Sequence, residues 1–271
     1  MIPPHHSLLS SWEFYTVSKV AIVTGGGGGI GAGIVRALLA AGHKVVATGR
    51  NGAKLDKFAA EIGNPGLSTI AVDLTADEAP RAIVDHALAT FGRLDIVVNN
   101  AGSFNFGPVD QTSDAMLDEV LAVSARAPFR LCREAIPHLG AGSSVLFIGS
   151  TWGLYGTPGG GAYSFVKAGL IGLMQTMAAE YGRKGIRSNY IAPTVVRTEM
   201  TDAFWDLDFF QRTNQELTPL GRDCTVEDVA QMAAFLVSDA AGFITGQTIA
   251  VDGGVSTTRY VDPAAVGAVR Q

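Results

Sequence analysis

Short apolar runs alternate along the chain with longer segments in which apolar residues recur at helical spacing. The apolar runs are rich in Val and Ile, and they are continuous rather than alternating in polarity. Continuous runs are typical of strands in a parallel sheet that is buried on both faces. We therefore expect strands at 19–24, 44–48, 67–72, 94–99, 144–149, 186–192 and 247–251.

The segments between these runs have the length of helices. They cover 31–41, 53–62, 76–91, 114–138, 162–184 and 225–237. Strand–helix alternation with parallel pairing predicts an α/β fold, in which a doubly wound, seven-stranded parallel sheet carries helices on both faces.

A single domain is expected to span residues 19–254. Residues 198–222 interrupt the alternation, and we interpret them as an inserted lid. Residues 1–18 then form an N-terminal arm, and residues 255–271 form a C-terminal tail. In a doubly wound sheet, ligands bind at the carboxyl ends of the strands, where the strand order reverses.

Composition excludes some classes of partner. The 271 residues are 47% hydrophobic and 17% charged, with a formal net charge of -5 and no basic block, which argues against a nucleic-acid surface. The mean hydropathy is +0.24, but no uncharged apolar run reaches the ~18 residues that a membrane span needs. We expect no nucleic-acid partner and no membrane segment.

The N-terminus and the cysteines indicate a cellular compartment. No Lys or Arg precedes Lys19, so the positively charged start of a secretory signal is missing. The chain contains two cysteines, Cys132 and Cys224, without a metal-binding or redox spacing. We expect reduced thiols, no metal site and a cytoplasmic protein.

A glycine-rich segment follows the first expected strand and opens the first expected helix. Glycines let the backbone approach a pyrophosphate, and a helix N-terminus offers free N–H groups and a positive dipole end. A simple turn is the alternative, but the position after the first strand favours a nucleotide site. Three registers fit a dinucleotide loop: Gly25/Gly29/Gly31, Gly27/Gly31/Gly33 and Gly26/Gly28/Gly31.

Tyr163 and Lys167 are four residues apart, and Ser150 precedes the tyrosine by thirteen. A phenol ionises near pH ~10, but a lysine one helical turn away lies on the same face, and its charge lowers that pKa. A serine at a strand end could hold a substrate oxygen against the phenol. The spacing alone is weak, because Tyr15 and Lys19 repeat it without a matching serine. Together the three predict an acid/base site that interconverts an alcohol and a carbonyl.

Separated motifs in this order resemble those of the short-chain dehydrogenase/reductase family over roughly residues 19–254. The resemblance sets the glycine register as Gly25, Gly29 and Gly31 and implies a Rossmann-type fold. The motifs are Thr-Gly-x-x-x-Gly-Ile-Gly at 24–31, Asn-Asn-Ala-Gly at 99–102, the Ser150/Tyr163/Lys167 set, TPLGR at 218–222 and ITGQTIAVDGG at 244–254.

The resemblance implies hydride transfer between a nicotinamide and a substrate carbon. Tyr163 would exchange the proton, Lys167 would lower its pKa and bind the nicotinamide ribose, and Ser150 would orient the oxygen. Asp73 resembles the residue that contacts adenine, although it could instead cap the following turn. The cofactor-binding residues implied are Thr24, Gly25, Gly29, Ile30, Gly31, Arg50, Asp73, Leu74, Asn100, Ala101, Gly102, Tyr163, Lys167, Pro193, Val196 and Thr198.

The choice of cofactor depends on the end of the second strand. An acidic residue there favours NAD, whereas an arginine accommodates a 2′-phosphate. This chain has Gly49 at the acidic position and Arg50 next to it. We therefore favour NADP(H), with NAD(H) as the alternative if Arg50 is only a solvated loop charge. The second basic residue that related NADP enzymes carry just before Gly29 is missing, because that position is Gly28.

Two positions depart from the family pattern. Ser124 stands where the family has an asparagine that helps to hold a water connecting the lysine to solvent, and we count it in the catalytic set. Thr194 replaces a family glycine after Pro193, so its Cβ could press on the nicotinamide end. Our hypothesis is that the enzyme remains active with both.

Aromatic residues after the strand ends and in the lid favour a bulky, largely apolar ketone or secondary alcohol. Half of them could instead only close the lid. The residues are Phe104, Phe106, Trp152, Leu154, Tyr155, Phe204, Trp205, Phe209 and Phe210.

Two other functions remain open. One is a 3-oxoacyl-carrier-protein reductase, which needs a basic surface near the pocket; the turn HLGAGSS before the fifth strand has none, and Arg183 and Lys184 lie elsewhere. The other is a degenerate dinucleotide-binding sensor. The resemblance also implies a homodimer or homotetramer that forms through the helices at 114–138 and 162–184 and the C-terminal strand.

Overall fold

The computed structural model of the chain describes residues 18–208, 212 and 216–258. Its centre is a seven-stranded sheet in the order β3-β2-β1-β4-β5-β6-β7, and every pair of neighbouring strands is parallel. The strand order reverses between β1 and β4, which makes the sheet doubly wound. The strands are β1 (Val20–Thr24), β2 (Lys44–Gly49), β3 (Leu67–Ala71), β4 (Ile96–Asn99), β5 (Ser144–Ile148), β6 (Arg187–Pro193) and β7 (Thr248–Val251).

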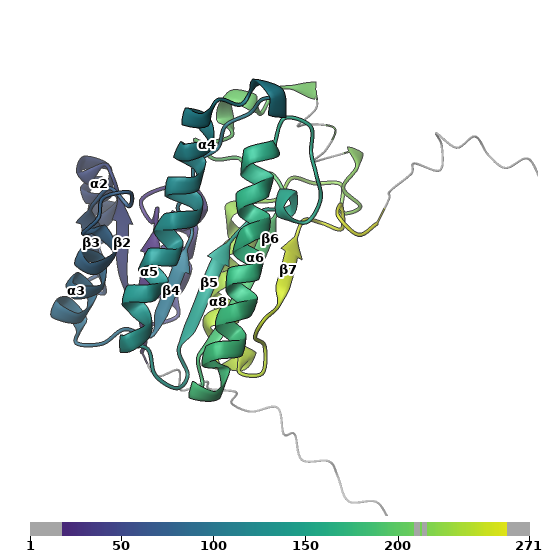
Figure 1. Cartoon of the computed structure of the whole chain (residues 1–271). Helices are drawn as coiled ribbons and strands as arrows, with labels where there is room; N and C mark the ends of the chain where they lie inside the picture. The colour runs from purple at the N-terminus through teal and green to yellow at the C-terminus, as the bar shows by residue number, and fades with distance from the viewer. Residues whose placement is uncertain (1–17, 209–211, 213–215, 259–271) are drawn as a thin grey trace, which may run out of the picture.

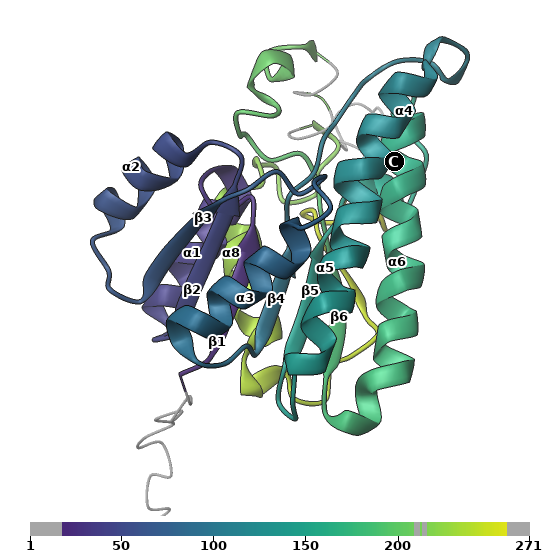
Figure 2. The ribbon, with the colours of Figure 1, turned by 60° about the vertical axis from the view of Figure 1, so that its left-hand side comes forward.

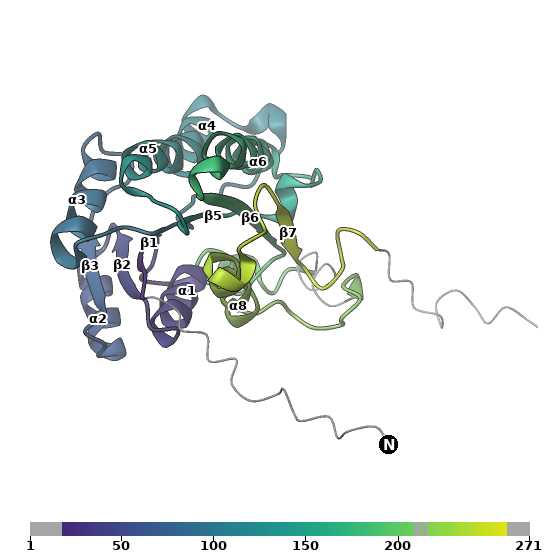
Figure 3. The same ribbon diagram turned by 90° about the horizontal axis from the view of Figure 1, so that it is seen from below.

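Helices cover both faces of the sheet (Figure 3). One face packs against α1 (Gly29–Ala40), α2 (Gly52–Ile62) and α8 (Val226–Val237), and the opposite face packs against α3 (Ala79–Phe91), α5 (Ala127–Ala135) and α6 (Gly161–Tyr181). Apolar strands such as β1, β4 and β5 are buried along their whole length between these layers. The fold class expected from the sequence is confirmed.

The expected helix at 114–138 is not continuous. It consists of α4 (Asp114–Leu121), a π-helical turn (Ala122–Arg126), α5 and a final 3-10 turn (Ile136–His138). Pro128, which has no backbone N–H to donate, lies in the first turn of α5, directly after the π-helical turn. The π turn places Ser124 in a buried position beneath the cavity described below.

Other boundaries shift by a few residues. The expected helix at 76–91 begins at Ala79, with Pro80 in its first turn, and the expected helix at 31–41 begins two residues earlier, at Gly29. The strand expected at 94–99 begins at Ile96. Tyr15 and most of the expected arm lie outside the described residues, as do Phe209, Phe210 and the tail beyond residue 258.

The segment that follows β6 crosses above the carboxyl edge of the sheet (Figure 2). It contains a 3-10 turn (Asp202–Phe204) within the described part of residues 198–222, the expected lid. Among the described residues, no helix has the combination of length and hydropathy that a bilayer crossing requires. The same residues contain no cluster of side chains that could hold a metal ion.

Candidate active site

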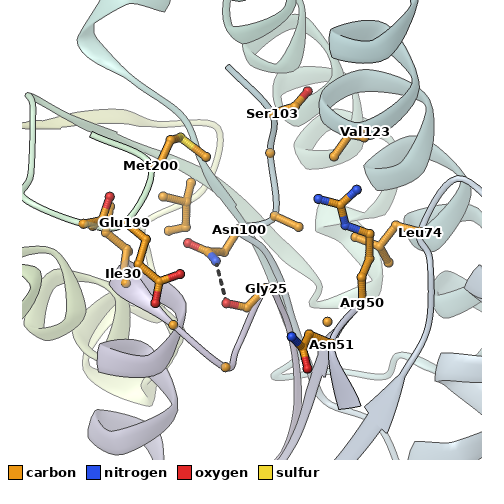
Figure 4. Close-up of a pocket in the computed structure, with 18 of the residues that line it drawn as sticks. Gly25, Ile30, Arg50, Asn51, Leu74, Asn100, Ser103, Val123, Glu199 and Met200 are labelled. Atoms are coloured by element: carbon orange, nitrogen blue, oxygen red, sulfur yellow. Dashed lines mark hydrogen bonds between the residues drawn. The ribbon is translucent and has the colours of Figure 1, made fainter. Parts of the chain in front are cut away.

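A cavity of about 420 Å³ opens at the carboxyl edge of the sheet. Its wall is built from the loops after β1, β2, β3, β4 and β5, from α6 and from the segment after β6 (Figure 4). It therefore extends from Arg50, after β2, to Gly149, after β5. This is the switch point of the strand order, where doubly wound folds bind their ligands.

The glycine loop forms one side of the cavity and has the shape of a phosphate cradle. Gly25 and Gly29 adopt φ values of +66° and +50°, which L side chains rarely adopt. A Cβ on Gly31 would lie 2.2 Å from the Gly25 carbonyl oxygen, so the loop closes tightly on the first turn of α1. Gly28 is the N-cap of α1 and lines the cavity. Because it bears no side chain, no side chain caps the N-terminus of α1 on this side. These features fit a dinucleotide pyrophosphate.

Thr24 and Asn100 hold this loop against the end of β4. The Thr24 hydroxyl accepts the backbone N–H groups of Asn100 and Ala101, both at 3.0 Å. The Asn100 side chain donates to the Thr24 carbonyl at 2.8 Å and to the Gly25 carbonyl at 3.5 Å (Figure 4). Thr24 therefore supports the cradle from behind, whereas Asn100, Ala101 and Gly102 line it.

Ser150 follows β5 and begins a short 3-10 turn (Thr151–Gly153). Its backbone is extended, and its hydroxyl accepts the Trp152 N–H at 3.1 Å. The same side chain is hydrogen-bonded to the Tyr163 phenol. The structure therefore joins two of the three residues that the sequence singled out.

Tyr163 and Lys167 lie one turn apart on α6 and line the cavity. Burial raises the pKa of Tyr163 to about 12, and the Ser150 hydrogen bond opposes the rise. This direction is opposite to the expected one, because desolvation of the phenolate outweighs the stabilising contacts. Burial also lowers the pKa of Lys167 to about 8. The Lys167 ammonium lies 5.4 Å from the centre of the Tyr163 ring and donates to the Ile148 carbonyl at 3.0 Å.

The sequence did not indicate Tyr190, a fully buried residue of β6. Its hydroxyl accepts the Ser150 N–H at 3.0 Å and donates to the Lys167 carbonyl at 3.2 Å. A Cβ on Gly149 would lie 1.7 Å from the Tyr190 ring, so that glycine makes room for it. Tyr190 thus ties together the two elements that carry the candidate catalytic groups.

Replacing Tyr190 with Phe tests this positioning role. We expect kcat to fall roughly threefold to tenfold, because ~0.7–1.4 kcal/mol of transition-state stabilisation is lost when Ser150 and α6 lose their common anchor. The dinucleotide Kd should stay unchanged, since Tyr190 does not belong to the described cavity wall. Steady-state kinetics with a parallel binding titration would check both, with Tyr181→Phe at the far end of α6 as the control. A loss confined to Kd would contradict the assignment.

Ser124 lies behind the cavity wall and is 1% exposed. Its hydroxyl accepts the Ser103 N–H at 3.0 Å, and a Cβ on Gly102 would lie 3.3 Å from this oxygen and 3.5 Å from the Lys167 ammonium. Ser124, whose side chain is shorter than the asparagine of the family, therefore supports the loop after β4 on the side where Lys167 lies. Thr194 is also buried, donates its N–H to the Val251 carbonyl at 3.1 Å and lies outside the described cavity wall.

The loops after β2 and β3 contribute both expected and unexpected residues to the cavity wall. Arg50 lines the cavity (Figure 4), and Gly49 leaves the usual acidic position empty. Asp73 lines it too, but its carboxylate accepts the N–H and the hydroxyl of Thr75, at 2.9 and 2.8 Å. These two hydrogen bonds lower the pKa of Asp73. Asp73 therefore caps the turn that follows it and also lines the cavity. Lys54, in the first turn of α2, also lines the cavity, and no sequence pattern indicated it.

Most expected cofactor residues line the cavity, including Ile30, Leu74 and Thr198. Thr24, Gly31, Pro193 and Val196 do not belong to the described wall. Thr24 and Gly31 act through the shape of the glycine loop, whereas Val196 is 4% exposed and packs in the core. Wall residues that no sequence pattern indicated are Asn51, Lys54, Leu55, Val72, Ser103, Glu119, Val123, Ile148, Gly149, Glu199 and Met200. Gly27 and Gly28, from the alternative glycine registers, and Gly49, at the end of β2, also line the cavity.

Several of the expected aromatic residues gather at Tyr163. The Phe104 ring meets the Tyr163 ring edge-on at 5.2 Å between centroids, and Trp152 does the same at 6.1 Å. Phe104 also contacts Phe106 at 6.4 Å and Phe204 of the lid at 6.0 Å. The Tyr163 ring therefore lies in an aromatic, apolar environment formed by Phe104 and Trp152. Trp205 instead stacks on Arg197 at 5.6 Å, and Leu154 is 41% exposed.

Comparison with known proteins agrees with this geometry. Residues 25–256 match the model of a family described as enoyl-(acyl carrier protein) reductase. A D-threitol dehydrogenase of Mycolicibacterium smegmatis is 32% identical over 247 residues, which cover 90% of this chain and 95% of the relative.

Solved structures give the same result. A 3-ketoacyl-(acyl-carrier-protein) reductase of Brucella melitensis, complexed with NADH, is 29% identical with a TM-score of 0.82 and covers 88% of this chain and 98% of its own. A blue fluorescent protein from a metagenomic library, in complex with NADPH, is 30% identical with a TM-score of 0.82 and covers 88% and 97%. The chain thus belongs to the short-chain dehydrogenase/reductase family of oxidoreductases.

Proposed function

We propose that this oxidoreductase uses NADP(H) to interconvert a ketone and a secondary alcohol on a bulky, largely apolar substrate. The observation that carries the proposal is a single cavity that joins the glycine loop and Arg50 to Tyr163 and Lys167. A dinucleotide would lie along this wall, with its pyrophosphate on the N-terminus of α1. When bound, its nicotinamide supplies or accepts the hydride.

The protein contributes proton transfer and positioning. In the reducing direction, the Tyr163 phenol donates its proton to the carbonyl oxygen, and the Ser150 hydroxyl holds that oxygen in place. The positive charge of Lys167 favours the phenolate that remains. A phenol with a raised pKa stays protonated at neutral pH, which suits the donor role in reduction.

The preference for NADP(H) rests on the loop after β2. Gly49 cannot accept hydrogen bonds from ribose hydroxyls as a carboxylate would, and it does not repel a phosphate. Arg50 offers the planar group that binds phosphate well. The two solved relatives hold NADH and NADPH respectively, so the family alone does not decide the matter.

The aromatic cluster around Phe104 supports a bulky apolar substrate. A substrate ring could replace some of the edge-on contacts that Phe104 and Trp152 make with Tyr163. A carrier-bound 3-oxoacyl substrate is the second candidate, because the Brucella melitensis relative is a reductase of that class. Arg183 and Lys184 precede β6 and so lie at the amino edge of the sheet, away from the cavity, which does not favour docking of an acidic carrier there.

Cofactor oxidation by the purified protein separates these functions. NADPH and NADH would each be supplied with aromatic and alicyclic ketones and with a 3-oxoacyl substrate on its carrier protein. We expect NADPH-dependent reduction of the ketones. Turnover of the carrier-bound substrate alone would favour the second candidate, and dinucleotide binding without any turnover would indicate a sensor.

The rate of reduction should depend on pH through Lys167. Burial lowers the pKa of this lysine to about 8, so its charge is present below that pH and is lost as the pH rises through it. Without the charge, the phenolate left by proton transfer is less stable, so kcat/KM for reduction should fall on the alkaline side. A pH profile of kcat/KM would check this. A profile that stays flat well above pH 8 would contradict the role of Lys167.

We further propose that the protein works in the cytoplasm as a homodimer or homotetramer. Cys132 and Cys224 are both free, in keeping with a reducing compartment. Phe129 on α5 and Phe165 on α6 are 54% and 65% exposed, as expected if these helices pack against a second copy. Light scattering coupled to size exclusion would measure the oligomeric state.

A further inference from the structure

Lys54 places a positive charge directly above the glycine loop. The Asn51 side chain caps α2 by accepting the Lys54 N–H at 3.0 Å, which fixes the lysine in the first helical turn. Its ammonium then reaches back across the cavity rim, so that a Cβ on Gly28 would lie 2.7 Å from Nζ. The ammonium therefore occupies the space that a basic side chain at position 28 would enter.

The Lys54 ammonium is held there by Glu199, which belongs to the segment after β6. Its carboxylate oxygens lie 2.6 and 2.5 Å from Nζ. Both residues line the cavity, and Figure 4 shows Glu199 beside Ile30 and the start of α1. The neighbouring Thr198 lies close to the loop as well, since a Cβ on Gly29 would be 3.1 Å from its methyl group. The ion pair thus bridges α2 and the lid segment over the glycine loop.

The ion pair between Lys54 and Glu199 is weak enough for a phosphate to replace the carboxylate. The two side chains are 39% and 80% exposed, and pairs in such positions contribute only ~0–1 kcal/mol. A phosphate dianion carries more charge and more acceptor oxygens than a carboxylate, and its bonds to cations are charge-assisted. Among the described residues of the cavity wall, the basic ones are Arg50, Lys54 and Lys167, and Lys167 lies at the Tyr163 end.

We propose that Lys54 is the second cation of a 2′-phosphate site, together with Arg50, and that Glu199 is a competing counterion that gives up Lys54 when the phosphate binds. Lys54 would replace, from a different element, the basic side chain that Gly28 lacks. Arg50 and Lys54 both belong to the β2–α2 connection and the first turn of α2, where a dinucleotide fold meets the adenosine ribose. The inference rests on the proposed use of NADP(H).

Dinucleotide titrations of the full chain, followed by fluorescence, test the role of Lys54. We expect Lys54→Met to weaken NADPH binding about tenfold, because one charge-assisted hydrogen bond is lost, and to leave NADH binding within about twofold. Lys57→Met is the matched control, since this exposed lysine follows on the same helix outside the described cavity wall. It should change neither affinity.

Glu199→Gln tests the competition. Removing the carboxylate frees Lys54, so NADPH binding should tighten about threefold, while the same substitution in a Lys54→Met background should have no effect. Asp206→Asn controls for the loss of one negative charge from the lid. No tightening by Glu199→Gln, or an equal tightening in both backgrounds, would overturn the competition.

The remaining outcomes separate this inference from the proposed function. Equal weakening of NADPH and NADH by Lys54→Met would mean that the lysine contacts the pyrophosphate, and no weakening would mean that it contacts neither phosphate. Either result overturns the inference while the oxidoreductase function stands. A folded wild-type protein, verified by circular dichroism, that binds neither dinucleotide would overturn the proposed function and this inference with it.

Discussion

Tyr163→Phe is expected to lower kcat for ketone reduction by about a hundredfold to ten-thousandfold, the range for loss of a general acid. The substitution removes only the phenolic oxygen that is hydrogen-bonded to Ser150. The edge-on contacts of the ring with Phe104 and Trp152 remain, so the fold and the apolar side of the site should persist. Single-turnover kinetics with NADPH and a reducible ketone would measure the loss directly.

Binding separates a chemical defect from a structural one in this variant. The thermal unfolding midpoint should stay close to that of the wild type, and the dinucleotide Kd should change by at most a few fold, because the substitution keeps the ring and leaves the glycine loop unaltered. Ser164→Ala, next along α6, provides a control that also removes a single hydroxyl. Turnover within a few fold of the wild type would show that another group transfers the proton.

Gly31→Ala is expected to weaken dinucleotide binding by roughly tenfold to a hundredfold. The added Cβ would lie 2.2 Å from the Gly25 carbonyl oxygen and 2.6 Å from the Asn100 amide nitrogen. The backbone of the glycine loop must therefore move, at a cost of ~1–3 kcal/mol that also reduces stability. Titration with NADPH and NADH, alongside urea unfolding, would measure the two effects. Both dinucleotides should be affected equally, because the pyrophosphate is common to them.

Gly182→Ala is the matched control for Gly31→Ala. Gly182 follows α6 with a helical φ of -56°, and a Cβ there would meet nothing within 4 Å. Alanine should therefore be tolerated, with a gain of up to ~1 kcal/mol from the reduced freedom of the unfolded chain. If Gly31→Ala bound dinucleotides as tightly as the wild type, the loop would be more compliant than its packing indicates.

Local sequence patterns predicted the fold well, because the buried parallel strands and the glycine loop are local in sequence. Each strand was expected within two residues of its observed position, and the motif order placed Tyr163, Lys167 and Ser150 at one edge of the sheet. The break at Ala122–Arg126 was not predicted, since its residues fit an ordinary helix and the π turn depends on contacts such as Ser124 with Ser103.

The direction in which the pKa of Tyr163 shifts could not be predicted from the spacing of Tyr163 and Lys167. The separation of four residues on α6 correctly brings Lys167 near the ring. Whether the phenolate is favoured depends on how much water reaches the hydroxyl, and that is set by Phe104, Trp152 and the rest of the surrounding chain. Desolvation is a property of packing, and packing is not encoded in the spacing of two residues.

The sequence by itself determined the positions of the strands and helices and the family, because these depend on periodicity and on short motifs. It also singled out Ser150, Tyr163 and Lys167 as the candidates for proton transfer. Only the tertiary structure placed Tyr190 between Ser150 and Lys167, and Lys54 against Glu199 over Gly28. The residues of these contacts are 23 to 145 positions apart in the chain. No local pattern marks such partners, since they meet only when the sheet brings separate strand ends to the same edge.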